Sequence, residues 1–422
     1  MKEEEILQLV RERMKDRPKI VSMFENCYQD TLEKTIIRQE DGQVFMLTGD
    51  IPAMWLRDST NQLRPYLLAA EDNERIRQII EGVLKRQCRC ICLDPYANAF
   101  NEKADNKGHQ QDDTKMGPMI WERKYEIDSL CYPIQLAYLY WKNSGRTSHF
   151  DGDFKYAMET VLDLWIKEQD HMKNSDYTFR RANCPETDTL PGDGKGNPVA
   201  VTGMTWSGFR PSDDSCVYGY LIPSNMFAVV VLGYMLEINR AFYSDPILEQ
   251  KADRLRREIE EGIRRYGLTQ VDGYGEIYAY ETDGFGSYVL MDDANVPSLL
   301  SMPYYHYCSK EDSAYLRTRR WVLSSQNPYY YEGTAARGVG SPHTPKDYIW
   351  HIALAIQGMT AVDPDEKERI LDYFERTDAG CGVVHEGFHK DDPFKFTREW
   401  FSWSNAMFVE FVLSVCGLEI KS

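Results

Sequence analysis

Two adjacent carboxylates, Asp213 and Asp214, end a segment rich in aromatic and polar side chains, Trp-Ser-Gly-Phe-Arg-Pro-Ser-Asp-Asp over 206–214. A neighbouring negative charge and partial removal from water both raise a carboxyl pKa toward neutrality. Either residue therefore meets the requirement for a general acid, which must hold a proton at working pH. In the alternative interpretation, Ser212 or Asp213 caps a helix and Asp214 is solvated.

A third carboxylate, Glu386, lies between two histidines in the sequence His385-Glu-x-x-His389. This order is the zinc-peptidase signature, and it binds zinc only where a helix places both histidines on one face. Glycines at 380, 382 and 387 surround the motif, and each costs about 1 kcal/mol inside a helix. We therefore predict a loop that presents Glu386 as a free carboxylate, with a zinc peptidase as the rival hypothesis.

Two further segments place polar residues at the start of apolar stretches. An Arg57–Asp58 pair beside Trp55 suits a sugar ring, because the charged pair can bond vicinal hydroxyls while the indole stacks on C–H groups. Glu126 and Asp128 are a second pair of charged residues that could bond sugar hydroxyls in the same way. The alternative for Asp58 is a helix cap, and for the other two a carboxylate favoured by the helix dipole.

Two more polar segments are weaker candidates. The sequence Asp292-Asp-Ala-Asn295 has calcium-binding residue types but lacks the loop spacing of an EF-hand, so we expect no metal there. His343 lies in a segment rich in glycine and proline, 333–347, and is expected either to line a pocket or to be structural.

The elements that must position these residues are helices of two kinds. Charge-rich segments with apolar residues at helical spacing are typical of surface helices; they cover 3–34, 74–90, 152–172, 246–266, 312–323 and 364–375. Between them lie apolar segments with little charge, as expected of buried helices; these cover 58–70, 125–141, 215–236, 293–305, 348–360 and 400–415.

Six buried helices ringed by six amphipathic ones predict an all-α fold, the (α/α)6 barrel. The polar openings of the inner helices should then gather at one end and line a pocket. Segment 271–290 is expected to form loops or short strands over that end, because it is rich in glycine. No linker composition interrupts the chain, so residues 1–422 are predicted to be a single domain.

Composition excludes several classes of protein. The formal net charge of −17 disfavours nucleic acid and anionic membranes as partners, whereas 42% hydrophobic content excludes disorder. We expect no apolar run of the roughly 18 residues needed to span a membrane. The ten cysteines follow no disulfide or zinc spacing and no Asn-x-Ser/Thr site occurs, which together with the polar start of the chain predicts a cytoplasmic protein.

The sequence resembles glycoside hydrolase family 125, the exo-acting α-1,6-mannosidases. The resemblance is carried by Met54-Trp-Leu-Arg-Asp-Ser-Thr60, by Gly208-Phe-Arg-Pro-Ser-Asp-Asp214 with Tyr-Leu-Ile-Pro-x-Asn225, by His385-Glu-x-Phe-x-Lys-Asp-Asp-Pro393 and by Phe401-x-Trp-x-Asn405. It implies an (α/α)6 barrel that hydrolyses α-mannoside oligosaccharides with inversion, without a metal or other cofactor.

The same resemblance places the general acid on Asp213 and the general base on Glu386, with Asp214 and Glu399 as the alternatives. Trp55 is the expected stacking residue. The candidates for holding the hydroxyls of the terminal mannose are Arg57, Asp58, Glu126, Asp128, Arg210, Asn225, Asn295 and His343. The rival functions are another sugar enzyme of this fold, such as an epimerase, and a glycan-binding protein without catalysis.

Overall fold

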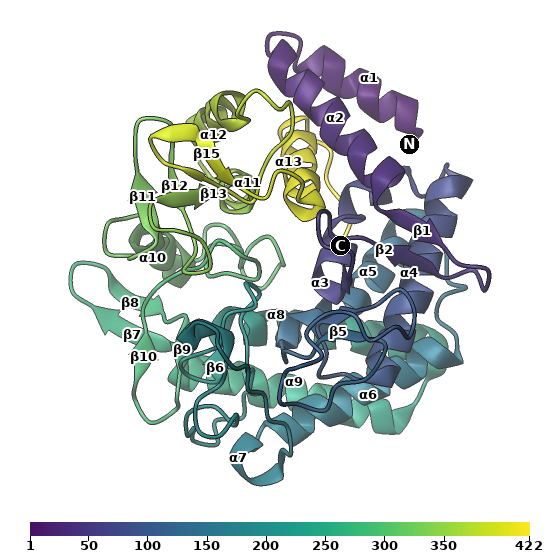
Figure 1. Cartoon of the computed structure of the whole chain (residues 1–422), viewed down its shortest axis with the longest axis vertical. Helices are drawn as coiled ribbons and strands as arrows, with labels where there is room; N and C mark the ends of the chain where they lie inside the picture. Colours follow the sequence, from purple (N-terminus) through teal and green to yellow (C-terminus); the bar gives the residue numbers. More distant parts are fainter.

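The computed structural model describes all residues from 1 to 422, and its helices form a double ring (Figure 1). The predicted (α/α)6 barrel is confirmed. The outer ring consists of α2 (Pro18–Lys34), α4 (Glu74–Leu93), α6 (Gly152–Glu168), α9 (Pro246–Tyr266), α10 (Ser313–Val322) and α12 (Pro364–Thr377). Short helical pieces lie outside this alternation, namely α1 (Glu3–Arg13), α7 (His171–Asn174), η2 (Glu186–Asp188) and η3 (Asn239–Tyr243).

The inner ring contains α3 (Leu56–Asn61) continued by η1 (Arg64–Ala69), α5 (Ile127–Ser144), α8 (Ile222–Ile238), α11 (His351–Met359) and α13 (Ser402–Val415). The two rings begin differently. Five outer helices start at an Asn or Asp side chain that accepts a backbone N–H of the first turn. All five inner helices start without such a cap, which leaves their positive ends for other partners.

Short strands lead directly into several inner helices. Strands β3 (Met54–Trp55), β6 (Tyr220–Leu221) and β13 (Tyr348–Trp350) immediately precede α3, α8 and α11. Trp55 therefore occupies the N-cap position of α3, and the alternative in which Asp58 caps this helix is wrong. Asp58 instead lies in the first turn, where its side chain is free to face the barrel end.

The fourth inner position is not helical, which corrects the prediction for 293–305. Pro297 and Pro303 have no backbone N–H to donate, and the Asp292 carboxylate accepts the N–H groups of Leu299 and Leu300 at 2.8 and 3.0 Å. A chain of turns results. Tyr305 from this segment stacks on Phe227 of α8 at 4.2 Å between ring centroids, so the turns still fill their place in the ring.

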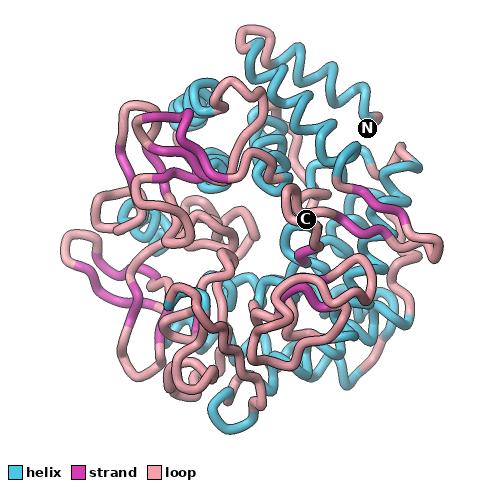
Figure 2. The backbone as a smooth tube through the Cα atoms, in the orientation of Figure 1, coloured by secondary structure: helices cyan, strands magenta, loops and turns pink.

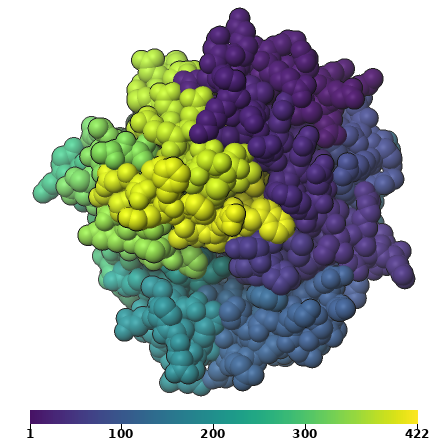
Figure 3. All heavy atoms as spheres, turned by 45° about the horizontal axis from the view of Figure 1, so that its top comes forward, coloured from purple at the N-terminus to yellow at the C-terminus, as the bar shows by residue number.

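The ring closes because α13 packs against α2, α3 and α11. The C-terminal residues accordingly lie beside N-terminal ones on the molecular surface (Figure 3). One apolar core of 113 residues runs from Ile6 to Cys416, whereas the second cluster holds only 3 residues. This continuity supports the proposal that residues 1–422 form one domain.

The strands form six small sheets distributed around the ring (Figure 2). The pairs are β1–β2 (Ile36–Arg38, Val44–Met46), β7–β8 (Leu268–Val271, Gly275–Tyr278) and β11–β12 (Tyr330–Glu332, Arg337–Val339). The three-stranded sheets are β3-β4-β5, with β4 (Ala99–Phe100) and β5 (Ile120–Glu122); β10-β9-β6, with β9 (Glu281–Thr282) and β10 (Tyr288–Val289); and β13-β14-β15, with β14 (Gly387–His389) and β15 (Asp392–Thr397). The expectation of short strands in 271–290 is confirmed.

One segment, Ile222–Tyr243, is long and apolar enough to cross a membrane by length and composition. The expectation that no such segment exists is therefore wrong. The segment comprises α8 and η3, and 56% of its apolar window is buried inside the protein. Its apolar character is that of an inner barrel helix enclosed by its neighbours.

Close packing of the inner helices leads to a first prediction. A Cβ atom at Gly358 of α11 would lie 2.3 Å from Phe411 Cε2 of α13, whereas one at Gly233 of α8 would meet nothing within 4 Å. Gly358→Ala should lower the free energy of unfolding by about 1–3 kcal/mol through overpacking. Its matched control Gly233→Ala should raise it by up to about 1 kcal/mol. Urea unfolding measures both, and equal effects at the two sites would contradict the described packing.

Candidate active site

A cavity of about 230 Å³ lies at the end of the barrel where inner helices α3, α11 and α13 begin. The polar openings of these three inner helices gather at one end, as was predicted for the whole inner ring. Among the predicted residues, the cavity is lined by Trp55, Arg57, Asp58, Asp213, Asn295, His343 and Glu386. The other lining residues are Thr48, Ile51, Pro211, Ser212, Thr344, Pro345, Trp350, Thr397, Arg398, Phe401 and Trp403.

Arg57 is the buried cation of the site, with 4% of its side chain exposed. Its guanidinium donates to Glu126 at 2.5 Å and to Asp213 at 3.2 Å. It also lies 3.5 Å from Asp58 and 3.7 Å from Asp128. The guanidinium carbon of Arg57 also lies over the Trp403 ring, 5.2 Å from its centroid. One cation thus connects four carboxylates, from α3, from the start of α5 and from the loop before α8.

Asp213 is held in an unusual backbone conformation with φ +67°, a region that non-glycine residues rarely adopt without support. Its carbonyl oxygen accepts from Lys124 Nζ at 2.7 Å and its Oδ1 accepts from Asn98 Nδ2 at 3.1 Å. Burial would raise the pKa of Asp213, but Arg57, a hydrogen bond with Glu126, and the charge of Lys124 together lower it. These contacts aim a carboxylate into the cavity.

Glu386 lies just before β14, where 8% of its side chain is exposed. Its nearest cation is Arg398, whose Nη1 is 3.7 Å away. Arg398 is itself held by Asp50 at 2.9 Å and stacks 4.0 Å from the Phe401 ring centroid. It has φ +48°, so two left-handed non-glycine residues flank the cavity. The alternative base, Glu399, is exposed and does not line it.

The zinc-peptidase hypothesis does not fit this geometry. Residues 387–389 form strand β14 rather than a helix or the predicted loop, so the two histidines do not share a helical face. His385 is fully buried and stacks on Phe396 with centroids 3.9 Å apart. No three His, Cys, Asp or Glu side chains come together in a geometry that would hold a metal ion.

Asp214 turns away from the cavity and pairs with His343 Nδ1 at 3.1 Å. His343 comes from the loop 333–347 and lines the cavity, as predicted for that loop. Burial lowers the pKa of His343, but the hydrogen bond and charge of Asp214 raise it to about 9. The imidazole is therefore positively charged at neutral pH. Segment 271–290, by contrast, contributes nothing to the lining.

The turn segment at the fourth inner position contributes Asn295. Its Nδ2 donates to Asp293 Oδ1 at 3.0 Å, which fixes the side chain at the cavity. Burial raises the pKa of the neighbouring Asp292 to about 8, against the effect of its two backbone N–H partners. Asp292 is thus occupied by the backbone rather than by an ion.

Four predicted contact residues lie outside the lining. Arg210 is paired with Glu281 at 2.6 Å, and the Asn225 amide bonds the backbone of Thr205 on both sides, each at 3.0 Å. Both are structural in this arrangement. Glu126 and Asp128 are fully buried behind Arg57. They face the guanidinium and not the cavity, so they do not contact a sugar hydroxyl directly in this arrangement.

Several lining residues were not predicted, above all Arg398 and the indoles of Trp350 and Trp403. Trp403 and Phe401 stand within a motif quoted above, but nothing in the spacing distinguishes a lining ring from a core ring. Arg398 offered a weak signal, as a cation near Glu386 in an acidic chain. Its role depends on a hairpin that brings residues 386 and 398 together.

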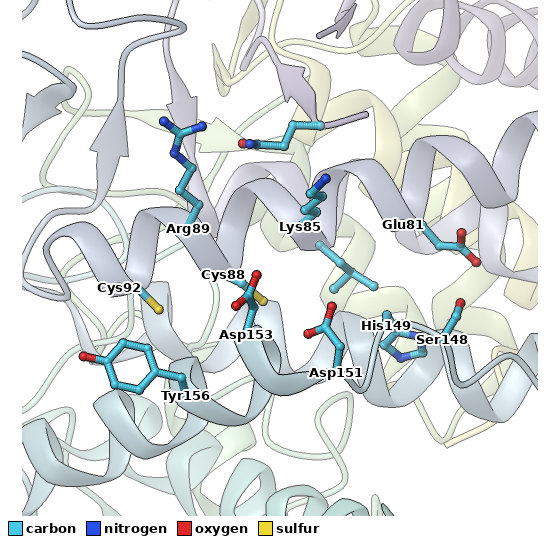
Figure 4. A pocket seen from close by; sticks show the side chains of 12 residues that line it. Glu81, Lys85, Cys88, Arg89, Cys92, Ser148, His149, Asp151, Asp153 and Tyr156 are labelled. Carbon is cyan, nitrogen blue, oxygen red and sulfur yellow. The ribbon is translucent and has the colours of Figure 1, made fainter. Parts of the chain in front are cut away.

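A second cavity, of about 500 Å³, lies between outer helices α4 and α6 (Figure 4). This cavity is larger than the first, but its side chains are less suitable for catalysis. Burial raises the pKa of Cys88 and of Cys92 on its wall, so neither thiol is a nucleophile. Lys85 is bound to the Asp41 carbonyl at 2.7 Å, and Asp151 caps α6. We therefore place the active site in the smaller cavity.

Comparison with known proteins shows the class of protein to which the chain belongs. An (α/α)6 barrel with two carboxylates in one polar, aromatic-walled cavity has the architecture of a glycoside hydrolase. A solved glycosidase variant bound to glucose shares the fold, with 12% identity and a TM-score of 0.60 over 99% of each chain. The sequence pattern of the metal-independent alpha-mannosidases, GH125, matches residues 17–413. The chain belongs to this family and is an α-mannosidase.

Two relatives extend the comparison. A Streptococcus pneumoniae metal-independent alpha mannosidase, solved in a non-productive complex with α-1,6-mannobiose, is 55% identical with a TM-score of 0.97. The match covers 99% of this chain and 98% of that one. The meiotically up-regulated gene 157 protein of Schizosaccharomyces pombe is 36% identical over 438 residues, which cover 98% of this chain and 85% of the yeast protein.

The Asp214–His343 pair yields a second prediction. Because the pKa of His343 rises from its ordinary 6.5 to about 9 on folding, protonated His343 stabilises the fold fully below about pH 6.5. That contribution is lost as the pH rises through about 9. Asp214→Asn should lower the pKa of His343 and weaken this pH dependence. NMR titration of the ring nitrogens checks it, and an unchanged His343 pKa would contradict the pairing.

Proposed function

We propose that the protein is an exo-acting α-mannosidase that removes non-reducing terminal α-1,6-linked mannose with inversion, using Asp213 as general acid and Glu386 as general base. The observation that carries the proposal is that both carboxylates line one small cavity although 173 positions separate them in the sequence (386 minus 213). Asp214 and Glu399, the two alternatives, do not line it.

The size of the cavity favours exo action. Pockets for drug-sized ligands measure about 300–1,000 Å³, and this one, at about 230 Å³, is smaller. A space of that size suits a single terminal sugar with the rest of the chain outside. The α-1,6 linkage is proposed from the streptococcal relative, which was solved with α-1,6-mannobiose.

Hydrolysis with inversion needs an acid and a base on the two sides of the scissile bond, about 6.5–9.5 Å apart. Protonated Asp213 gives its proton to the glycosidic oxygen as the bond to C1 breaks. Glu386 takes a proton from the water that attacks C1 from the other face. Arg398 lies 3.7 Å from Glu386, so a positive charge faces the base and helps to orient it.

The remaining lining residues suit recognition of the ring. Trp55, Trp350 and Trp403 supply indole faces for C–H groups. Arg57 and Asp58 offer a donor and an acceptor for vicinal hydroxyls, and Asn295 and His343 offer further polar contacts. The acidic surroundings also stabilise the positive charge that develops on the sugar in the transition state.

Other sugar chemistry on this fold, such as epimerisation, is the alternative function. An epimerase would interconvert a free sugar without releasing one, so release of mannose from α-1,6-mannobiose separates the two. We also propose a cytoplasmic location, since ten free thiols, several of them partly exposed, fit a reducing compartment.

Removing either carboxylate should remove most of the hydrolytic activity without unfolding the protein. Asp213→Asn and Glu386→Gln should each lower kcat/KM on α-1,6-mannobiose by about 100-fold or more. Glu399→Gln is the matched control for the base, and it should retain wild-type activity because Glu399 is exposed outside the cavity. Full activity in either carboxylate variant, or a loss in Glu399→Gln equal to that in Glu386→Gln, would contradict the assignment.

A further inference from the structure

The carboxylates around Arg57 carry more negative charge than the cations near them can neutralise. Four carboxylates lie within 3.7 Å of one guanidinium, and their side chains are 0–22% exposed. The next nearest cations are already paired, Lys124 with Asp188, His343 with Asp214 and Arg398 with Asp50. Because an unpaired buried charge is costly, this cluster must bind protons.

The hydrogen bonds show which carboxyl group is the partner of Asp213. Asp213 Oδ1 accepts from Arg57 and from Asn98, and Asp58 Oδ2 accepts from Thr48. Neither oxygen of Asp128 has a partner. Glu126 shares both of the Asp213 donors: Arg57 Nη1 donates to its Oε2 at 2.5 Å and Asn98 Nδ2 donates to its Oε1 at 3.2 Å, so the two carboxyl groups lie side by side. Two buried carboxyl groups held side by side repel each other when both are ionised, which favours one proton shared between them.

We infer that Glu126 is a positioning residue for the general acid: it shares one proton with Asp213, holds that proton in the resting enzyme and returns it to Asp213 when substrate fills the cavity. The inference rests on the proposed function of Asp213. It assigns Glu126 a role that does not require contact with the sugar, in agreement with its burial behind Arg57.

Each step of the transfer balances. In the resting enzyme the Glu126 O–H donates to ionised Asp213. When the glycosidic oxygen displaces water at Asp213, the Glu126 O–H bond breaks, a new O–H bond forms on Asp213, and ionised Glu126 is stabilised by Arg57 and by Ser129, which donates at 2.7 Å. The Asp213 proton then passes to the leaving oxygen, and Glu386 receives the proton of the attacking water. After product release, solvent returns one proton to the pair and removes one from Glu386.

The direction of the pKa shifts agrees with this assignment. Burial raises the pKa of Glu126 well above its ordinary range, although Arg57 opposes it, while the pKa of Asp213 is lowered. The charged or titratable groups that face the pair are Arg57, Asp58, Lys124, Asp128 and His343. Burial also raises the pKa of Asp128, to about 7. An isolated Asp with a pKa near 3.9 would be ionised at neutral pH and could not act as an acid.

The test measures hydrolysis of two substrates at several pH values by wild type and by Glu126→Gln. Glutamine removes the charge and donates an N–H to Asp213, so it favours the ionised acid. In the plot of kcat/KM against pH, the fall on the alkaline side (the basic limb) should move to lower pH. Activity on α-1,6-mannobiose at pH 7 should fall by about 100-fold. Activity on 2,4-dinitrophenyl α-mannoside, whose leaving group needs no proton, should fall by less than about 10-fold.

Two further variants keep the test decisive. Ser129→Ala removes a donor to Glu126 and leaves the carboxyl group intact, so Glu126 holds its proton more tightly and the basic limb should move to higher pH. Glu168→Gln is the matched control: Glu168 is equally buried but bonds Tyr96, His171 and Ser175 away from the cavity. It should leave the pH profile and the ratio of the two substrates unchanged.

Equal losses on both substrates with an unmoved basic limb in Glu126→Gln would show that Glu126 only supports Arg57, and would overturn the inference. An unmoved or lowered limb in Ser129→Ala would do the same. Asp213→Asn separates this failure from failure of the proposed function. If Asp213→Asn still hydrolyses mannobiose, the acid assignment itself is wrong. If Asp213→Asn loses activity on mannobiose but keeps activity on the dinitrophenyl substrate, while Glu126→Gln shows no such selective loss, only the inference is wrong.

Discussion

The site depends on a single guanidinium. Arg57 holds carboxylates from three parts of the chain at 2.5–3.7 Å, and its flat face lies over Trp403 of a fourth part, α13. An arginine remains charged even when buried and presents its donors in a fixed plane. It can therefore set both the position and the proton affinity of the groups around it. One buried cation among several carboxylates therefore positions the acid, its proton partner and the sugar-binding residues.

The barrel places the groups that surround this cation. Five of the outer helices begin at side-chain caps, whereas the inner helices begin without such caps and three of them directly follow short strands. Uncapped helix starts direct their positive ends toward the acidic cavity. Asp213 and Arg398 both have positive φ, which is strain that the surrounding hydrogen bonds maintain at the functional end of the molecule. Backbone geometry and electrostatics thus converge on the same few residues.

Helical periodicity and charge were enough to predict the ring of alternating helices and the end at which the cavity lies. They failed at 293–305, where apolar spacing is helical but two prolines and the Asp292 carboxylate bind the backbone into turns. Residue chemistry identified Glu386, Arg57 and Asp58 at the cavity and narrowed the acid to Asp213 or Asp214, of which the family resemblance favoured Asp213. It could not show that Arg210 is paired with Glu281, that Glu126 faces Arg57 rather than sugar, or that Arg398 reaches Glu386. Those facts depend on contacts between distant segments, which no local pattern encodes.

In the proposed mechanism one cavity holds an acid and a base that act in a single displacement at the anomeric carbon. Proton NMR of the first mannose released from an α-1,6-mannobiose solution reports the direction of water attack before mutarotation mixes the anomers. A single displacement assisted by Glu386 predicts β-mannose as the initial product. Initial release of α-mannose would mean a double displacement through a covalent intermediate, and would contradict the roles given to both carboxylates.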